Sequence, residues 1–189
     1  MINLNIDLLK IQLNLSNPKT IYMISPNKPI PFRTGFGIDF HQLVEGRELW
    51  IGGVKLEHTK GALGHSDADV LLHAICDAML GALCLGDIGL HFPDTEESYK
   101  NIDSKILLQK TIRFVTEAEY VVGNIDSTVC LEMPKLKPYI SEMQKVISQI
   151  LMINENQVSV KATTAEKMGF VGREEGIAAY ATVLLIHQP

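Results

Sequence analysis

The clearest helix signal in the sequence is the stretch Ser66-Asp-Ala-Asp-Val-Leu-Leu-His-Ala-Ile-Cys-Asp-Ala-Met79. Its opening, Ser66-Asp-Ala-Asp69, is typical of a helix N-cap with acids in the first turn. Apolar residues then recur with the period of a helix, at Val70, Leu71, Ala74, Ile75, Ala78 and Met79. The pattern predicts a helix that ends near residues 83–86.

Strand and helix patterns alternate on both sides of this stretch. Residues 33–40 alternate small and bulky side chains like a strand, and residues 49–51 and 54–57 flank Gly52-Gly53 like a hairpin. A second helix is predicted from an apolar stripe at helical spacing, formed by Leu107, Leu108, Thr111, Ile112 and Val115. A third helix has Pro138 in its first turn. Its apolar residues are Ile140, Met143, Val146, Ile147, Ile150 and Leu151. Further strands are expected at residues 121–131, 158–162 and 178–186. This order predicts an α/β (α+β) sandwich, ferredoxin-like, mostly one sheet with three helices packed on one face.

Size and composition predict one soluble domain. The chain has 189 residues, of which 46% are hydrophobic and 21% charged, and its formal charge of −5 argues against binding to nucleic acid or an anionic membrane. Its three cysteines, Cys76, Cys84 and Cys130, lack CxxC spacing, which argues against a disulfide framework or a thiolate zinc cluster and favours a reducing compartment. No apolar run approaches the roughly 18 residues of a membrane span.

Residues 1–32 differ in character from the domain expected at residues 33–189. They are rich in Asn, Ile and Lys, lack Gly and Arg, and contain Asp7 as their only acid. Scarcity of acids is typical of an organelle-targeting presequence, whereas the missing Arg is not. A remnant of a presequence and a loosely packed extension are therefore both retained as interpretations.

Asp39-Phe-His41 and His73 form the first candidate site. Alternation along a strand sends the side chains of Asp39 and His41 to one face. With His73 they would make an Asp-His-His zinc site with one open position. Asp69 and Asp77 lie one turn either side of His73, and either could orient its imidazole. The alternative is a surface pair and a hydrogen-bonded core histidine.

Polar residues before and after the central helix form a second group. His65 and Ser66 stand where free N–H groups and the helix dipole favour a phosphate, although Ser66 could equally cap its own helix. Asp87-Ile-Gly89 and Phe92-Pro-Asp94 could bind the hydroxyls of a small polyol, but turn chemistry also favours such residues. Neither group is decisive alone.

Residues 161–173 are the other dense polar stretch, and they read Lys-Ala-Thr-Thr-Ala-Glu-Lys-Met-Gly-Phe-Val-Gly-Arg. They follow a predicted strand, where α/β sheets often place ligands. Hydroxyls and backbone amides there could bind phosphate oxygens while Glu166 holds a hard divalent ion. A capped turn with surface charges is the alternative.

Taken in order, these motifs resemble the 2-C-methyl-D-erythritol 2,4-cyclodiphosphate synthase family over residues 33–186. The resemblance rests on Gly37-Ile-Asp-Phe-His41, His65-Ser-Asp-Ala-Asp-Val-Leu-Leu-His73, Gly86-Asp-Ile-Gly89, Phe92-Pro-Asp-Thr95, Pro134-Lys135 and the stretch at 161–173. Several spaced motifs in one order are far more specific than any of them alone.

The resemblance implies a role for each motif residue. Asp39, His41 and His73 would bind Zn²⁺, and Glu166 would bind a second divalent ion, Mg²⁺ or Mn²⁺. His65 and Thr164 would be catalytic residues that hold the phosphates in position during the transfer. The implied substrate contacts are Ser66, Asp87, Ile88, Gly89, Phe92, Asp94, Leu131, Met133, Pro134, Lys135, Leu136, Thr163, Ala165, Phe170 and Arg173. Among them, residues 131–137 and 163–166 match the family's cytidine-diphosphate pocket, and Phe170, Arg173 and Glu175 match positions near its central axis.

The resemblance also implies the reaction. The 2-phosphate of 4-diphosphocytidyl-2-C-methyl-D-erythritol 2-phosphate would attack the β-phosphate of the same molecule and expel CMP, a lyase step of the non-mevalonate isoprenoid pathway. The family is a homotrimer with active sites between subunits. Ala165 replaces a usual threonine, and Leu131-Glu132-Met133 differs from the small residues often found there. The N-terminal extension suggests a plastid-type organelle, chloroplast or apicoplast, with the cytoplasm as the alternative.

Two other functions fit parts of the pattern. A metal-dependent phosphohydrolase would use the same Asp-His-His site to activate water, and it would leave linear phosphates. A metal- or isoprenoid-binding module would bind its ligand without releasing CMP. The complete set of Asp39, His41, His73, Thr164 and Glu166 favours the synthase over both.

Overall fold

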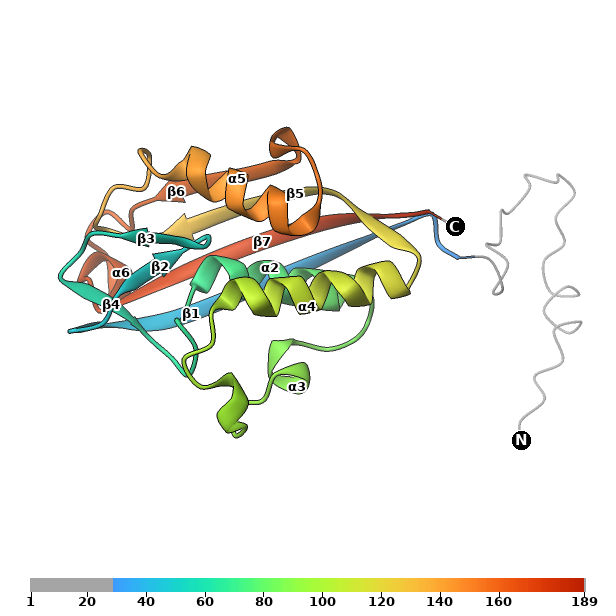
Figure 1. Ribbon diagram of the computed structural model, residues 1–189. Helices are drawn as coiled ribbons and strands as arrows, with labels where there is room; N and C mark the ends of the chain where they lie inside the picture. Colours follow the sequence, from blue (N-terminus) through green and yellow to red (C-terminus); the bar gives the residue numbers. More distant parts are fainter. Residues whose placement is uncertain (1–28, 189) are drawn as a thin grey trace, which may run out of the picture. The chain divides into compact units, whose positions relative to one another are not determined.

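The computed structural model describes residues 29–188, which build a mixed α/β fold around a five-stranded sheet (Figure 1). The sheet has the order β4-β1-β7-β5-β6 and consists of β4 (Lys60–Leu63), β1 (Phe32–Glu45), β7 (Gly176–His187), β5 (Tyr120–Cys130) and β6 (Val158–Thr163). The predicted strands at 33–40, 158–162 and 178–186 are confirmed within these bounds, and the one at 121–131 is confirmed except that β5 ends at Cys130. Residues 1–28, on which the presequence interpretation depends, lie outside the described residues.

The two-residue Gly52-Gly53 turn joins β2 (Leu49–Ile51) to β3 (Val54–Leu56), and this hairpin is confirmed as a separate two-stranded sheet. Both glycines have positive φ, of 62° and 76°, as tight hairpin turns require. The short strand β4 was not predicted from the sequence. Its four residues, Lys-Gly-Ala-Leu, show no alternation, and pairing with the far end of β1 makes them a strand.

The ferredoxin-like topology is wrong. Apart from the short β2, β3, β4 and α6, the elements follow the order strand, helices, strand, helix, strand, strand, whereas the ferredoxin-like order is β-α-β-β-α-β. A helical crossover makes β5 and β6 parallel, and β7 then returns antiparallel between β1 and β5. Periodicity identifies strands but not their neighbours, so the sequence pattern could not predict this insertion.

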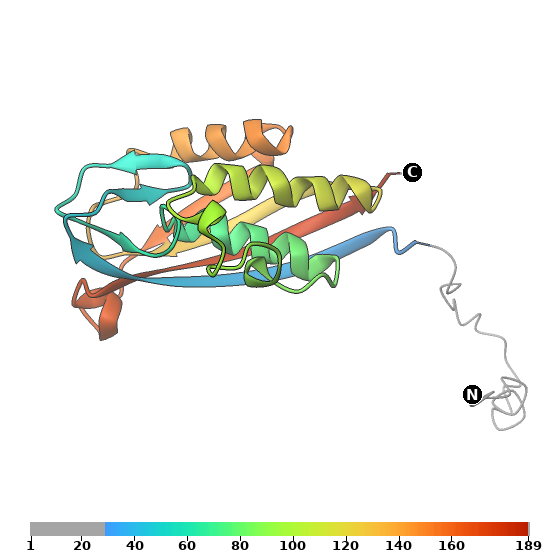
Figure 2. The same cartoon turned by 60° about the horizontal axis from the view of Figure 1, so that its bottom comes forward.

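Three longer helices, α2 (Val70–Ala82), α4 (Ser104–Glu117) and α5 (Ile140–Leu151), lie on the same side of the sheet in Figure 2. The shorter α3 (Ile88–His91), α6 (Gly169–Gly172), η1 (Glu97–Tyr99) and η2 (Glu155–Gln157) lie in the connections. Helix α2 begins after its N-cap Asp69, so the acids precede its first turn instead of occupying it. Pro138 likewise lies before α5, whose N-cap is Tyr139. Within residues 29–188, no helix has the length and apolarity that crossing a membrane requires.

Close contact between α2 and β1 positions the candidate site. A Cβ on Gly37 would lie 2.1 Å from the carbonyl oxygen of Ala74, and one on Gly35 would lie 1.8 Å from that of Ala78. Only glycine therefore lets the helix backbone approach this strand so closely. Helix α2 is accordingly almost entirely buried and forms the centre of the core.

The opposite face of β1 remains uncovered in the single chain. Phe32, Phe36, Ile38 and Phe40 alternate with the core-facing residues of β1 and are 62%, 58%, 39% and 52% exposed. Four large exposed apolar side chains on one open sheet face, interrupted by Thr34, are unusual for a monomer. This surface is called the β1 outer face below.

Candidate metal centre

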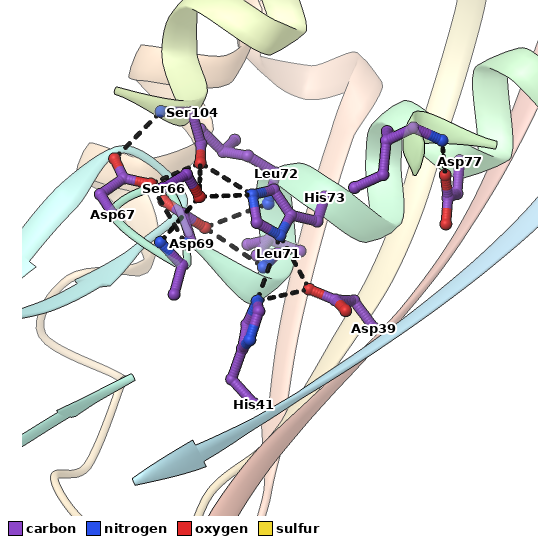
Figure 3. A network of polar contacts seen from close by, with 12 residues as sticks. Asp39, His41, Ser66, Asp67, Asp69, Leu71, Leu72, His73, Asp77 and Ser104 are labelled. Carbon is purple, nitrogen blue, oxygen red and sulfur yellow. Dashed lines mark hydrogen bonds and ion pairs between the residues drawn. The ribbon is translucent and has the colours of Figure 1, made fainter. Parts of the chain in front are cut away.

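Strand β1 and helix α2 bring the three predicted zinc ligands together (Figure 3). Asp39 and His41 are two residues apart on the helix-facing side of β1, and His73 projects towards them from α2. Oδ2 of Asp39 is 2.9 Å from Nε2 of His41 and 2.9 Å from Nδ1 of His73, and those nitrogens are 3.2 Å apart. All three side chains are partly or fully buried.

The donor set fits a metal ion. Nδ1 of His41 is 3.1 Å from the backbone carbonyl oxygen of Leu63, which can only accept, so Nδ1 carries a proton and Nε2 is the nitrogen that faces Asp39 and would meet a metal ion. One ligand atom from each of the three residues lies within 4.8 Å of the others. One carboxylate and two imidazoles with room for a fourth ligand are typical of catalytic zinc sites.

The charges of the cluster support each other. Burial alone would raise the pKa of the Asp39 carboxyl, but hydrogen bonds from His41 and His73 and their charge hold this pKa well below its usual range. Burial alone would lower the pKa of the His73 imidazole, but the hydrogen bond and the negative charge of Asp39 raise it instead. The site is therefore built around an ionised carboxylate that attracts a cation.

The expectation that Asp69 or Asp77 orients His73 is wrong. The buried Asp69 carboxylate accepts hydrogen bonds from the backbone amides of Gly52, Gly53, Leu71 and Leu72 at 2.6–3.2 Å. Asp77 accepts one from the amide of Ile88 at 2.8 Å. Helical spacing places both one turn from His73, but the Asp69 carboxylate binds the amides of the β2–β3 turn and of the first turn of α2, and that of Asp77 binds the amide at the start of α3.

Two serines occupy the place that these acids were expected to fill. Oγ of Ser104 is 2.9 Å and Oγ of Ser66 is 3.2 Å from Nε2 of His73, on the side away from Asp39 (Figure 3). Ser104 is the first residue of α4 and has no motif around it in the sequence. The one sequence signal that could have indicated Ser104 is its position directly after the expected loop at 93–103, at the start of the second predicted helix.

Two of the amides that the expected phosphate site at the N-terminus of α2 would use are occupied in this chain. The amides of Leu71 and Leu72 are bound to the N-cap carboxylate of Asp69, so they are not free for an anion. His65 instead lies in the loop before α2, with Nε2 3.3 Å from the backbone oxygen of Glu96. His65 and Ser66 nevertheless line the metal cavity.

A cavity of about 350 Å³ opens onto the three candidate ligands. The residues singled out from the sequence that line it are Asp39, His41, His65, Ser66, His73, Ile88, Gly89, Phe92 and Asp94. Tyr99, Ile102 and Leu107 also line it and were not predicted. Asp87 is not part of the wall, because its carboxylate accepts a hydrogen bond from the amide of Leu90 and caps α3.

A second cavity of about 350 Å³ collects most of the residues expected at the nucleotide pocket. It is lined by Leu131, Pro134, Lys135, Leu136, Lys137, Ala162, Thr163 and Thr164. Met133, Ala165 and Glu166 are not among the lining residues. Oγ1 of Thr164 donates to Oε1 of Glu166 at 2.6 Å. The two cavities have no lining residue in common, so one chain keeps His65 and Thr164 in separate cavities.

The residues expected near a central axis lie in α6 and between α6 and the start of β7. Phe170 packs on Phe40, with ring centroids 6.0 Å apart. The guanidinium of Arg173 donates two hydrogen bonds to the Glu175 carboxylate at 2.9 Å each, and both side chains are exposed. Phe170 therefore continues the apolar β1 outer face.

Known proteins match the sequence and the fold of this chain. The chain is 63% identical over 153 residues to a protein of Bacteroides fragilis named 2-C-methyl-D-erythritol 2,4-cyclodiphosphate synthase, which covers 81% of this chain and 96% of that protein. Among solved structures, the bifunctional IspDF from Campylobacter jejuni has a TM-score of 0.80 and 44% identity, over 82% of this chain and 42% of that one. IspF of Plasmodium falciparum in complex with CDP has a TM-score of 0.75 and 35% identity, over 86% and 100%.

A model of the YgbB family matches residues 32–186. The matched segment begins at the start of β1 and ends one residue before the end of β7, so it contains nearly the whole sheet, both cavities and the three candidate ligands. This chain belongs to the YgbB family.

Proposed function

We propose that this protein is a 2-C-methyl-D-erythritol 2,4-cyclodiphosphate synthase. It converts 4-diphosphocytidyl-2-C-methyl-D-erythritol 2-phosphate to the cyclic 2,4-diphosphate and releases CMP, in the non-mevalonate pathway to isoprenoid precursors. The observation that carries the proposal is the Asp39-His41-His73 cluster at the wall of a cavity, in a chain 63% identical to a synthase of that name.

The proposed metal is Zn²⁺, held by Oδ2 of Asp39, Nε2 of His41 and Nδ1 of His73. Two imidazoles and one carboxylate suit zinc better than the oxygen-seeking Mg²⁺. When bound, this ion supplies a Lewis acid that polarises a phosphate oxygen. The chain supplies the strand and helix that hold the three ligands in place.

The chain's remaining task is to hold two anionic groups of one substrate against each other. Phosphoryl transfer depends mainly on positioning and charge neutralisation. His65 and Ser66 border the same cavity as the ligands and would bind phosphate oxygens, while Gly89 and Asp94 would contact the methylerythritol part. No side-chain nucleophile is needed, since the attacking oxygen belongs to the substrate.

The second cavity is proposed to hold the cytidine diphosphate. Lys135 and Thr164 line it together with apolar residues such as Leu131 and Leu136, and a family relative has been solved in complex with CDP. The Glu166 carboxylate next to Thr164 would bind Mg²⁺ or Mn²⁺ against the departing phosphate. Further proposed contacts with the substrate are Asp87, Ile88, Phe92 and Met133.

The active protein is proposed to be a homotrimer with its sites between subunits. The proposed metal and nucleotide cavities share no lining residue within one chain, so a complete site could join one cavity from each of two chains. The exposed apolar β1 outer face also needs a cover. Phe170 and Arg173 would then lie near the central axis.

The relatives support one of the two cellular locations that the sequence suggested. The curated relative from Bacteroides fragilis is bacterial, and a bacterial relative is compatible with the cytoplasmic alternative. The plastid interpretation depended on residues 1–32 and has no support from this relative. We propose the cytoplasm on that basis.

Incubation of the protein with 4-diphosphocytidyl-2-C-methyl-D-erythritol 2-phosphate and Mg²⁺, followed by phosphorus NMR, tests the proposal. The synthase produces the cyclic diphosphate and an equal amount of CMP. Linear phosphate products would support the phosphohydrolase instead, and tight zinc binding without any CMP would support a binding module. Either result would overturn the proposed function.

A further inference from the structure

A chain of hydrogen bonds leads from the metal centre to a carboxylate that does not touch it (Figure 3). Nε2 of His73 is 2.9 Å from Oγ of Ser104, and that hydroxyl makes a very short hydrogen bond to Oδ1 of Asp67. The backbone amide of Ser104 donates to Oδ2 of the same carboxylate at 3.0 Å. Asp67 thus binds the first residue of α4 through both of its oxygens.

The direction of every proton in this chain follows from what each group can do. A carboxylate only accepts, so the hydroxyl proton of Ser104 is committed to Asp67. Oγ of Ser104 must then accept from His73, which places a proton on Nε2 of that imidazole. Ser66 does not oppose this, since its oxygen lies 3.2 Å from Nε2 and can accept as well.

The arrangement leaves Nδ1 of His73 facing the candidate ligands Asp39 and His41. In a neutral imidazole one nitrogen carries the proton and the other a lone pair, so a proton held on Nε2 makes Nδ1 the nitrogen available to a metal. His73 is 6% and Ser104 is 0% exposed, and in so dry a place water offers little competition for these bonds.

We propose that Asp67 is a positioning residue that acts through Ser104 to fix the tautomer and orientation of His73 for metal binding. The inference rests on the proposed metal centre and deepens it. It assigns a task to an acid that contacts neither ligand atom nor substrate cavity, and it explains why the first turn of α4 is tied to the loop before α2.

Asp67→Asn tests the proposal because the amide changes proton direction with little change in shape. If its NH₂ faces Oγ of Ser104, the hydroxyl must turn its own proton towards His73, which moves the imidazole proton to Nδ1. If the NH₂ faces the backbone N–H of Ser104 instead, two donors meet. The first arrangement also opposes the NH₂ to a backbone N–H, that of Asp69, but this donor lies at 3.3 Å and that of Ser104 at 3.0 Å. The first arrangement therefore costs less, and it blocks the metal-binding nitrogen.

The expected result is a zinc affinity about 10- to 100-fold weaker in full-length Asp67→Asn than in the wild type, as for other partners of metal-bound histidines. Competition with a chromogenic chelator measures it. Asp103→Asn is the matched control: it removes the same charge at the same helix end, where Asp103 accepts from the amide of Lys105 at 2.8 Å, and Asn is an equally good N-cap. Its zinc affinity should stay within about threefold of wild type, since it has no bond to His73 or Ser104.

A second variant and a spectrum keep the test independent of stability. Ser104→Ala should weaken zinc binding similarly, and adding Asp67→Asn to it should cost little more, because both act through one hydroxyl. Nitrogen-15 NMR of the zinc-free proteins should find Nε2 of His73 protonated in the wild type and unprotonated in Asp67→Asn. Circular dichroism confirms folding.

Three outcomes would overturn the inference: unchanged zinc affinity in Asp67→Asn, equal losses in Asp67→Asn and Asp103→Asn, or losses in Asp67→Asn and Ser104→Ala that simply add. A wild-type protein that binds no zinc would instead overturn the proposed metal centre. The two failures are therefore distinguished by the wild type alone.

Discussion

At the scale of single residues, the site depends on which atom of each side chain is free. His41 turns Nε2 inward because the carbonyl of Leu63 occupies its Nδ1, and His73 uses the opposite nitrogen because Ser104 lies at its Nε2. The sequence indicates both histidines through their spacing and motifs. It contains no sign of which nitrogen is used, because the partners come from β4 and α4.

His73→Ala should abolish most zinc binding. We expect about one Zn²⁺ per chain in the wild type, since one site of three protein ligands with an open fourth position is present. Elemental analysis after dialysis measures the metal. His91→Ala is the control, because His91 binds the backbone oxygen of Leu85 away from the cluster and its loss should leave zinc unchanged. Equal zinc in wild type and His73→Ala would remove His73 from the site.

Glu166→Gln should depress turnover more than about tenfold, because a divalent ion on a departing phosphate supplies several kcal/mol. Zinc content should not change, since Glu166 is not in the Asp39-His41-His73 cluster. The amide keeps the shape but loses the charge, so excess Mn²⁺ should recover part of the activity. Phosphorus NMR across a Mn²⁺ titration follows both products. Glu155→Gln, on the distant η2, should behave like wild type, and normal turnover of Glu166→Gln at limiting metal would contradict the assignment.

At the scale of elements, the site exists because β1 and α2 touch through their backbones. Gly35 and Gly37 make this contact possible, and the same face of β1 carries Asp39 and His41 two and four residues later. The glycines are visible in the sequence as part of the small-and-bulky alternation. The sequence does not show that these glycines let α2 approach β1, because a strand pattern does not indicate which helix will pack against the strand.

Gly37→Ala should destabilise the protein and loosen the metal site together. The new Cβ would lie 2.1 Å from the oxygen of Ala74 and 2.7 Å from the amide nitrogen of Ala78, so the α2 backbone must move. Overpacking of this kind costs roughly 1–3 kcal/mol or more. Thermal and denaturant unfolding, with zinc affinity measured beside them, check the expectation.

Gly81→Ala provides the matched comparison on the same helix. A Cβ there has no neighbour closer than 3.9 Å, so the substitution should stabilise the fold by about 0.4–1 kcal/mol through the unfolded chain. If Gly37→Ala proved as harmless as Gly81→Ala, the close approach of α2 to β1 would not be what positions His73.

At the scale of the whole molecule, the single chain leaves two features incomplete. Its proposed metal and nucleotide cavities are separate, and its β1 outer face exposes a row of large apolar side chains. One assembly would account for both, if neighbouring chains join the cavities and bury the face. Neither feature is visible in composition, since single exposed apolar residues are ordinary on any surface.

Light scattering should give a mass of about three times 21.0 kDa. Phe36→Asp, which places a charge on the β1 outer face, should dissociate the assembly and lower turnover. Ile106→Asp is the control, because Ile106 is also exposed, at 41%, but lies on α4. A stable, fully active monomer would show that the shared site was wrongly inferred.

The sequence by itself determined what depends on neighbours along the chain. Alternation placed Asp39 and His41 on one face of a strand, helical period marked the stretch after Asp69, and ordered motifs indicated the family and its three metal ligands. Tertiary structure alone decided the insertion of β7 between β1 and β5, the separation of the two cavities, and the partners of His73. Ser104 lies 31 residues from His73, and no local pattern specifies such a pair, because side chains far apart in sequence meet only when the packing of whole elements brings them together.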